Sequence, residues 1–132
     1  MLILDSTITS SASCSISTYN NNEHINIENS TIQSNNNLAI VVTKPNTVFN
    51  IKNSIIQTSS TIAMGPNVDT ALNSSIYLCK NTIISSRYDI KNNIISTNYY
   101  YYNNTFMNST NIPTLSNPNN NNVKQTELAC AE

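Results

Sequence analysis

Asparagine recurs along this chain at a nearly constant spacing, and this recurrence limits the possible folds more than any other feature. Six acidic or amide residues anchor the repeat: Asp5, Asn29, Asn53, Asn81, Asn92 and Asn104. An apolar residue lies two positions before each anchor, another lies three positions after it, and a serine or threonine lies five positions after it. A period of 24 residues with one longer interval is typical of a solenoid, in which similar coils stack on one another.

The composition indicates that each repeat contains short β-strands. Asn, Ile, Ser and Thr together fill 77 of the 132 positions, and only 10% of the residues are charged. β-branched residues such as Ile and Thr favour strands, whereas helical bundles need the Ala, Leu, Glu and Lys that this chain largely lacks. We therefore expect an all-β fold built from strands such as 54–58 and 82–86.

The two apolar columns of the repeat predict a bend at every anchor. The columns lie five residues apart, an odd separation that would place them on opposite faces of one straight strand. If both columns are buried, the chain must turn between them. Asn enters the left-handed backbone region more readily than other non-glycine residues, so Asn replaces Gly at the corners of a chain that has a single Gly.

The longest interval and the end of the chain depart from the repeat. The interval from Asn53 to Asn81 contains Met64-Gly65-Pro66-Asn67, the strongest turn signal in the sequence. We expect the extra residues of this interval to form a loop. Residues 111–132 include an Asn- and Pro-rich run, so we expect a β-helix repeat domain over 1–110 and a disordered tail over 111–132.

Residues 27–32, 51–56 and 90–95 share the pattern Ile-x-Asn followed by polar and apolar residues, and this pattern resembles the right-handed parallel β-helix of the pectate-lyase-like superfamily. The resemblance covers roughly residues 2–110 and implies a single-stranded solenoid of about five coils. It further implies a structural ladder of stacked amides, whose members here are Asn29, Asn53, Asn81, Asn92 and Asn104. The superfamily includes lyases, hydrolases, adhesins and phage tail spikes, so the resemblance does not imply one activity. This chain departs from it in having almost no Gly and no recognisable capping helix.

Several classes of protein do not fit the sequence. A net charge of −1 with six basic residues predicts no nucleic-acid partner. No apolar run approaches the roughly 18 residues of a membrane span, and the first residues contain no basic n-region of a secretory signal, so the compartment stays undetermined. The three cysteines (Cys14, Cys79 and Cys130) form no CxxC motif and are odd in number. We therefore expect reduced thiols, with no metal and no cofactor.

The run Tyr99-Tyr100-Tyr101-Tyr102 is the candidate binding feature. Four consecutive aromatic residues place two on each face of a strand. Exposed aromatic faces suit the stacking of sugar rings or of a partner, although the same tyrosines could instead cover the end of the core.

The charged residues and the single histidine suggest no catalytic site. Glu28, Lys52 and Lys80 are expected to form an outward row that keeps the strands soluble. Arg87, Asp89 and Lys91 are expected to form a surface ion-pair cluster, and His24 to lie in a turn. A polysaccharide lyase or hydrolase would need several clustered carboxylates, which the sequence does not offer.

The sequence thus favours a non-enzymatic structural or binding module, with carbohydrate or a cell surface as its expected partner. One alternative is a fragment of a polysaccharide lyase or hydrolase of the same fold. Another is an Asn-rich, aggregation-prone product without a defined function, since low-charge strands suit cross-β stacking and could associate through exposed β-edges.

Overall fold

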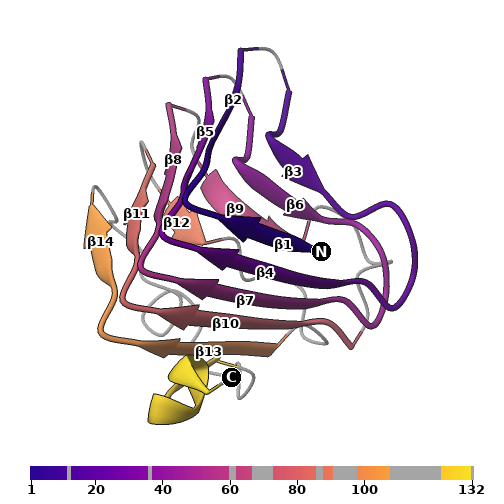
Figure 1. Ribbon diagram of the computed structural model, residues 1–132, viewed down its shortest axis with the longest axis vertical. Helices are drawn as coiled ribbons and strands as arrows, with labels where there is room; N and C mark the ends of the chain where they lie inside the picture. Colours follow the sequence, from indigo (N-terminus) through magenta and orange to yellow (C-terminus); the bar gives the residue numbers. More distant parts are fainter. Residues whose placement is uncertain are drawn as a thin grey trace.

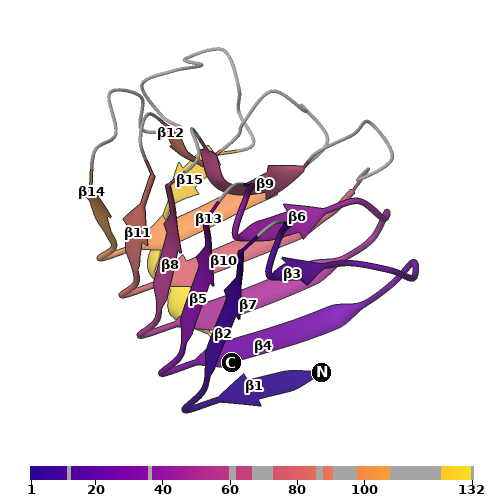
Figure 2. The ribbon, with the colours of Figure 1, turned by 90° about the horizontal axis from the view of Figure 1, so that it is seen from above.

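The protein is a parallel β-solenoid in a computed structural model, which describes residues 1–11, 13–35, 37–59, 62–66, 73–85, 88–90, 98–107 and 123–131. Each coil contributes one strand to each of three parallel sheets, so that strands far apart in the sequence lie side by side (Figures 1 and 2). This confirms the all-β, stacked-coil architecture. Three turns are described nearly in full (β1–β3, β4–β6 and β7–β9), whereas later turns are described in part. The expected five coils therefore slightly exceed what the structure describes in full.

The strands of each sheet follow the order in which the coils stack. The first sheet contains β1 (Leu2–Leu4), β4 (His24–Glu28), β7 (Val48–Lys52), β10 (Ser75–Cys79), β13 (Asn98–Tyr102) and β15 (Val123–Gln125). The second contains β2 (Thr7–Ser10), β5 (Thr31–Ser34), β8 (Ile55–Thr58), β11 (Thr82–Ile84) and β14 (Thr105–Met107). The third contains β3 (Ile16–Ser17), β6 (Ile40–Val42), β9 (Ile62–Pro66) and β12 (Tyr88–Ile90). A 3-10 turn, η1 (Glu127–Cys130), follows β15.

The core consists of columns of apolar side chains that point into the solenoid. In the middle coils these side chains are completely enclosed, with exposed fractions of 1% for Ile27 and 0% for Ile32. Ile27 pairs in register with Ile51, and Ile32 with Ile56, so each isoleucine packs on its equivalent in the next coil. Burying one such side chain contributes roughly 1.5–3 kcal/mol.

The predicted bend between the two apolar columns is confirmed. Ile27 and Ile32 both point inward although they are five residues apart, because Asn29 between them adopts a φ of 51°. Asp5 and Asn53 make the same corner in the neighbouring coils, with φ of 49° and 48°. The left-handed conformation turns the chain from the first sheet into the second without the glycine that such a φ usually requires.

From the fourth coil onward the structural register differs from the predicted one by one residue. Cys79 pairs with Lys52, so the residue that follows Cys79, Lys80, takes the corner position with a φ of 56°. Asn103 takes it in the next coil, with a φ of 54°. The inward apolar columns accordingly contain Leu78 and Ile83 rather than Cys79 and Ile84. In Ile90-Lys91-Asn92, Ile90 belongs to β12 of the third sheet, and Asn92 lies outside the described residues.

The predicted asparagine ladder is therefore divided between two columns. Asn29 and Asn53 form the corners, while Asn81 and Asn104 lie one position further along and point inward, in line with serines of the earlier coils. Backbone N–H groups donate to side chains along this second column: Ser6 to Ser30 Oγ (3.1 Å), Ser30 to Ser54 Oγ (3.1 Å), Ser54 to Asn81 Oδ1 (2.9 Å) and Asn81 to Asn104 Oδ1 (2.8 Å). A lysine ammonium has no acceptor, which explains why Asn81, rather than Lys80, occupies the inward position.

The hydroxyl column, whose direction the sequence left open, faces inward where the structure describes it. Ser34 and Thr58 are buried, and their hydroxyls donate to the backbone carbonyls of Ser13 and Asn37, each at 2.6 Å. Ser85, which is 1% exposed, is the equivalent in the fourth coil. The hydroxyls of Ser34 and Thr58 satisfy carbonyl groups at the corner between the second and third sheets.

Two predictions about irregular segments were wrong. Met64, Gly65 and Pro66 are not a turn: they belong to β9, which pairs with β6 as far as Pro66, its last residue. The predicted tail is ordered over residues 123–131, because β15 pairs with β13 and η1 follows it. Residues 111–122 and Asn67 lie outside the described residues, and the domain boundary near residue 110 stays a prediction.

Candidate functional site

The outer face of the first sheet gathers the chemically useful side chains of this protein. Side chains alternate along each strand, so the residues between the buried isoleucines point outward. The outward positions are His24, Asn26 and Glu28 on β4; Val48, Asn50 and Lys52 on β7; Ser75 and Tyr77 on β10; and Asn98, Tyr100 and Tyr102 on β13. Amides thus occupy the middle coils of this face, and aromatic rings occupy the later coils.

The tyrosine run alternates between the two faces of β13, as the sequence predicted. Tyr99 is 1% exposed and lies in the core, where burial raises the pKa of its hydroxyl well above the usual value. Tyr101 also points inward, with its ring edge-on to Phe106 at a centroid distance of 6.2 Å. Tyr100 and Tyr102 are half-buried on the outer side. Only these two of the four predicted binding tyrosines therefore face a possible ligand.

Tyr100 stacks on an aromatic residue that the sequence analysis did not single out. Its ring lies parallel to that of Tyr77, with an interplanar angle of 11° and a centroid distance of 4.7 Å. The two residues pair in register on β10 and β13, so the stack follows the spacing of about 4.8 Å between neighbouring strands. The sequence contains a signal for this stack: the segment Ser-Ile-Tyr-Leu-Cys (75–79) precedes the tyrosine run by one repeat, which aligns Tyr77 with Tyr100.

The amides of the middle coils form a hydrogen-bonded row beside this stack. The Asn50 side-chain nitrogen lies 2.7 Å from Nε2 of His24 and donates to Oδ1 of Asn26 at 3.0 Å. Asn50 occupies the register position of Tyr77 on the preceding coil. His24 opens strand β4 and is exposed, so the prediction that it lies in a turn was wrong.

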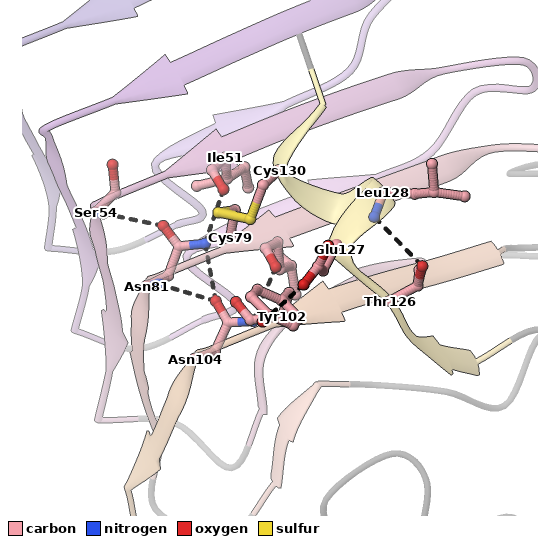
Figure 3. The surroundings of a disulfide bond; sticks show 11 residues. Ile51, Ser54, Cys79, Asn81, Tyr102, Asn104, Thr126, Glu127, Leu128 and Cys130 are labelled. Carbon is pink, nitrogen blue, oxygen red and sulfur yellow. Dashed lines mark hydrogen bonds between the residues drawn. A yellow bond between two sulfur atoms is a disulfide. The ribbon is translucent and has the colours of Figure 1, made fainter.

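A disulfide holds the C-terminal segment over the outer face (Figure 3). Cys79 and Cys130 are bonded, with their Cα atoms 5.1 Å apart. The Tyr102 hydroxyl donates to Oε1 of Glu127 at 3.2 Å, and Thr126 caps η1 by accepting from the Leu128 N–H. The expectation of reduced thiols was wrong for this pair, because the segment that contains Cys130 lies against the first sheet. Cys14 is a free, half-buried cysteine.

Two adjoining hollows lie between the outer face and the C-terminal segment. The larger, of about 400 Å³, is lined by His24, Val48, Asn50, Tyr77, Tyr100, Leu128 and Ala131. The smaller, of about 260 Å³, is lined by Leu2, Asn26, Ile27, Glu28, Asn50, Lys52 and Ala131. Asn50 and Ala131 contribute to both, so the hollows continue one another along the sheet. Sequence reasoning could not find them, because one wall consists of the segment that it predicted to be disordered.

The predicted charged row is only partly formed. Glu28 and Lys52 pair in register on β4 and β7, whereas Lys80 lies at a corner with a φ of 56°. Of the predicted surface ion-pair cluster, the side chains of Arg87, Asp89 and Lys91 lie outside the described residues. Within the described parts of the chain, no group of three or more His, Cys, Asp or Glu residues could hold a metal ion.

Comparisons of this chain with protein-family models, with curated proteins and with solved structures found no match. The structure therefore defines the protein as a parallel β-solenoid, and a pectate-lyase-like relationship stays a prediction. No helix of the described residues is long and apolar enough to cross a membrane.

Proposed function

We propose that this protein is a non-enzymatic carbohydrate-binding solenoid whose binding site is the larger hollow on the outer face of the first sheet. The observation that carries the proposal is the junction of a tyrosine stack with a row of amides inside one hollow of about 400 Å³. Concave sites that combine an apolar surface with a few fixed polar groups are the usual form of ligand sites.

The Tyr77 ring supplies the apolar surface of the site. One face of Tyr77 is covered by Tyr100, so its opposite face is turned toward the preceding coil. The residue in register on that coil is Asn50, whose side chain is much smaller than a tyrosine. Because the Asn50 side chain is shorter than that of Tyr77, the exposed face of the Tyr77 ring has room for a flat ring beside it. The C–H groups on one face of a sugar ring suit such an aromatic surface.

The polar groups around this step match the hydroxyl groups of a sugar. Asn50 is held by His24 and Asn26, which fixes the direction of its amide before any ligand arrives. Amides offer both donors and acceptors, and a sugar hydroxyl needs one of each. Preorganised polar groups of this kind lower the entropic cost of binding.

The sequence resemblance to the pectate-lyase-like superfamily supports a glycan as the ligand. The parallel sheets and stacked coils agree with that resemblance at the level of fold. Right-handedness and membership of the superfamily remain part of the proposal.

Titration calorimetry with a panel of defined oligosaccharides, both neutral and uronic, tests the proposal. We expect at least one member to bind, and we expect Tyr77→Ala and Asn50→Ala each to weaken binding about tenfold, equivalent to 1.4 kcal/mol. Tyr19→Ala is the matched control, because Tyr19 is 83% exposed and lines neither hollow. The proposal fails if no oligosaccharide binds, or if the control weakens binding as much as Tyr77→Ala.

A second candidate function, cleavage of a polysaccharide, is favoured by Glu28 and Lys52, which occupy the same register position on β4 and β7 and both line the smaller hollow. Glycoside hydrolases generally use two carboxyl groups, and the described lining of this hollow contains one. Incubation of the same panel with the protein, followed by product analysis, distinguishes the two functions. Cleavage that Glu28→Gln abolishes would establish an enzyme, whereas binding without cleavage supports the binding module.

A further inference from the structure

In the described part of the chain, the first coil of the solenoid presents a strand edge without a paired neighbour on each of its three sides. Among the residues that the structure describes, β1, β2 and β3 are each the outermost strand of their sheets, and each pairs on one side only, with β4, β5 and β6 respectively. Figure 2 shows these three strands at one end of the stack. Free edges of this kind carry unpaired N–H and C=O groups that can template a further strand.

The hydrogen bonds of the first coil show which groups point to the free edge. The carbonyls of Met1, Ser6 and Ser10 accept from the second coil, through the N–H groups of Asn26, Thr31 and Asn35. Because neighbouring residues of a strand direct their backbone groups to opposite sides, those of Leu2, Leu4, Thr7 and Thr9 point away from the second coil.

On the first and second sheets, the core side chains of the first coil are less covered than their equivalents in later coils, whereas Ile16 on β3 is buried. Ile3 and Ile8 are half-buried, whereas the next residues in their columns, Ile27 and Ile32, are 1% and 0% exposed. Met1, Leu2 and Leu4 are 66%, 65% and 46% exposed. Residues 1–17 contain one charged side chain, Asp5, and no lysine or proline, the residues that usually protect strand edges from pairing.

The arrangement of the three strand edges limits which partner can pair with all of them. A single extended peptide could pair with only one edge, so full coverage requires three strands on the three sides of a coil. The first coil of a second copy offers such a set and carries little charge to oppose the contact. The other end of the solenoid fits less well, because β15 already covers β13 there.

We propose that two copies of this chain dock through their N-terminal coils around a two-fold axis. Strand β1 then pairs antiparallel with β1 of the second copy, and β2 pairs with β3. The contact continues, between molecules, the coil-on-coil packing within each molecule, and an isologous contact of this kind closes after two subunits. This proposal does not depend on carbohydrate binding, since no residue of the first coil lines the larger hollow, which is the proposed binding site.

Sedimentation equilibrium of the full chain over a range of concentrations tests the proposal. We expect a reversible dimer with twice the chain mass of 14.6 kDa. The double variant Leu2→Lys/Leu4→Lys adds two charges per copy at the contact, and we expect it to raise the dimer dissociation constant about tenfold or more. Thr9→Pro adds no charge but removes a backbone N–H from the free edge, and it should also raise the dimer dissociation constant. Circular dichroism checks that both variants are folded.

Ile55→Lys is the matched control, because Ile55 is 40% exposed but lies on β8, which is paired on both sides. We expect this variant to dimerise as the wild type does. A wild-type chain that is monomeric at every concentration would overturn the proposal, as would equal weakening by Ile55→Lys. Open-ended assemblies in place of dimers would also overturn it and would favour the aggregation-prone alternative.

Discussion

The two ends of the solenoid differ in how their outermost strands are covered. At the N-terminal end, β1 has one partner among the described strands, and its inward residue Ile3 is half-buried. At the other end, β13 is covered by β15 and by η1, which a disulfide attaches to β10, and Tyr99 in β13 is 1% exposed. In the columns of Ile3 and Ile8, a core residue is fully buried only when a further coil lies on each side, whereas Ile16 on β3 is already down to 6% exposed in the first coil.

The largest expected effect tests this rule within a single column of the core. Ile32→Ala should lower the free energy of unfolding by about 2–5 kcal/mol, because it opens a cavity between two coils. Ile8→Ala removes the same atoms one coil earlier, where water already reaches the side chain, and should cost clearly less. Urea denaturation in the Leu2→Lys/Leu4→Lys background, where the N-terminal coil is uncovered, measures both values. Equal costs would show that burial at the two positions does not differ in solution.

The disulfide is expected to account for much of the stability of the covered end. Cys130→Ser, or reduction of the wild type, should lower the free energy of unfolding by about 2–4 kcal/mol, because the bond closes a loop between residues 51 positions apart. It should also release η1 and weaken oligosaccharide binding, since Leu128 and Ala131 line the larger hollow. Cys14→Ser is the control. If Cys130→Ser leaves both quantities unchanged, the C-terminal segment does not cover the sheet in solution.

The inward polar column provides a comparison between the two halves of the solenoid. The Asn81 side chain accepts from the Ser54 N–H and donates to the Ile51 carbonyl and to Asn104, whereas the Ser30 hydroxyl accepts from Ser6 and donates to Glu28. Asn81→Ala should cost about 1–3 kcal/mol, since it leaves buried partners unsatisfied. Ser30→Ala should cost less, because its Ser6 partner lies in the first coil, near water. Urea denaturation of the two variants checks this order, and the reverse order would contradict it.

The sequence allowed the corners and the apolar columns of the first three coils to be predicted, because residues such as Asn29 and Ile27 repeat there every 24 positions. The register failed at Lys80-Asn81, where two adjacent polar residues both fit a corner and only the hydrogen bond from Ser54 decides between them. The hollow could not be predicted at all. Its wall depends on the contact between Cys79 and Cys130, and no local pattern encodes a contact across 51 residues.

The corner residue of the fourth coil gives the smallest effect and the sharpest comparison among coils. The five described corners between the first and second sheets have a φ between 48° and 56°, and four of them are Asp or Asn, whose side chains favour this conformation; the fifth is Lys80. Lys80→Asn should therefore raise the free energy of unfolding by about 0.5–1 kcal/mol, and Lys80→Gly should also stabilise the protein. The reciprocal change, Asn53→Lys, should lower the free energy by a similar amount, as measured by urea denaturation. If Lys80→Asn destabilises the protein instead, then Lys80 makes a favourable interaction in solution that outweighs its backbone conformation. The preference for Asn at these corners would then depend on the coil rather than on the φ that all five share.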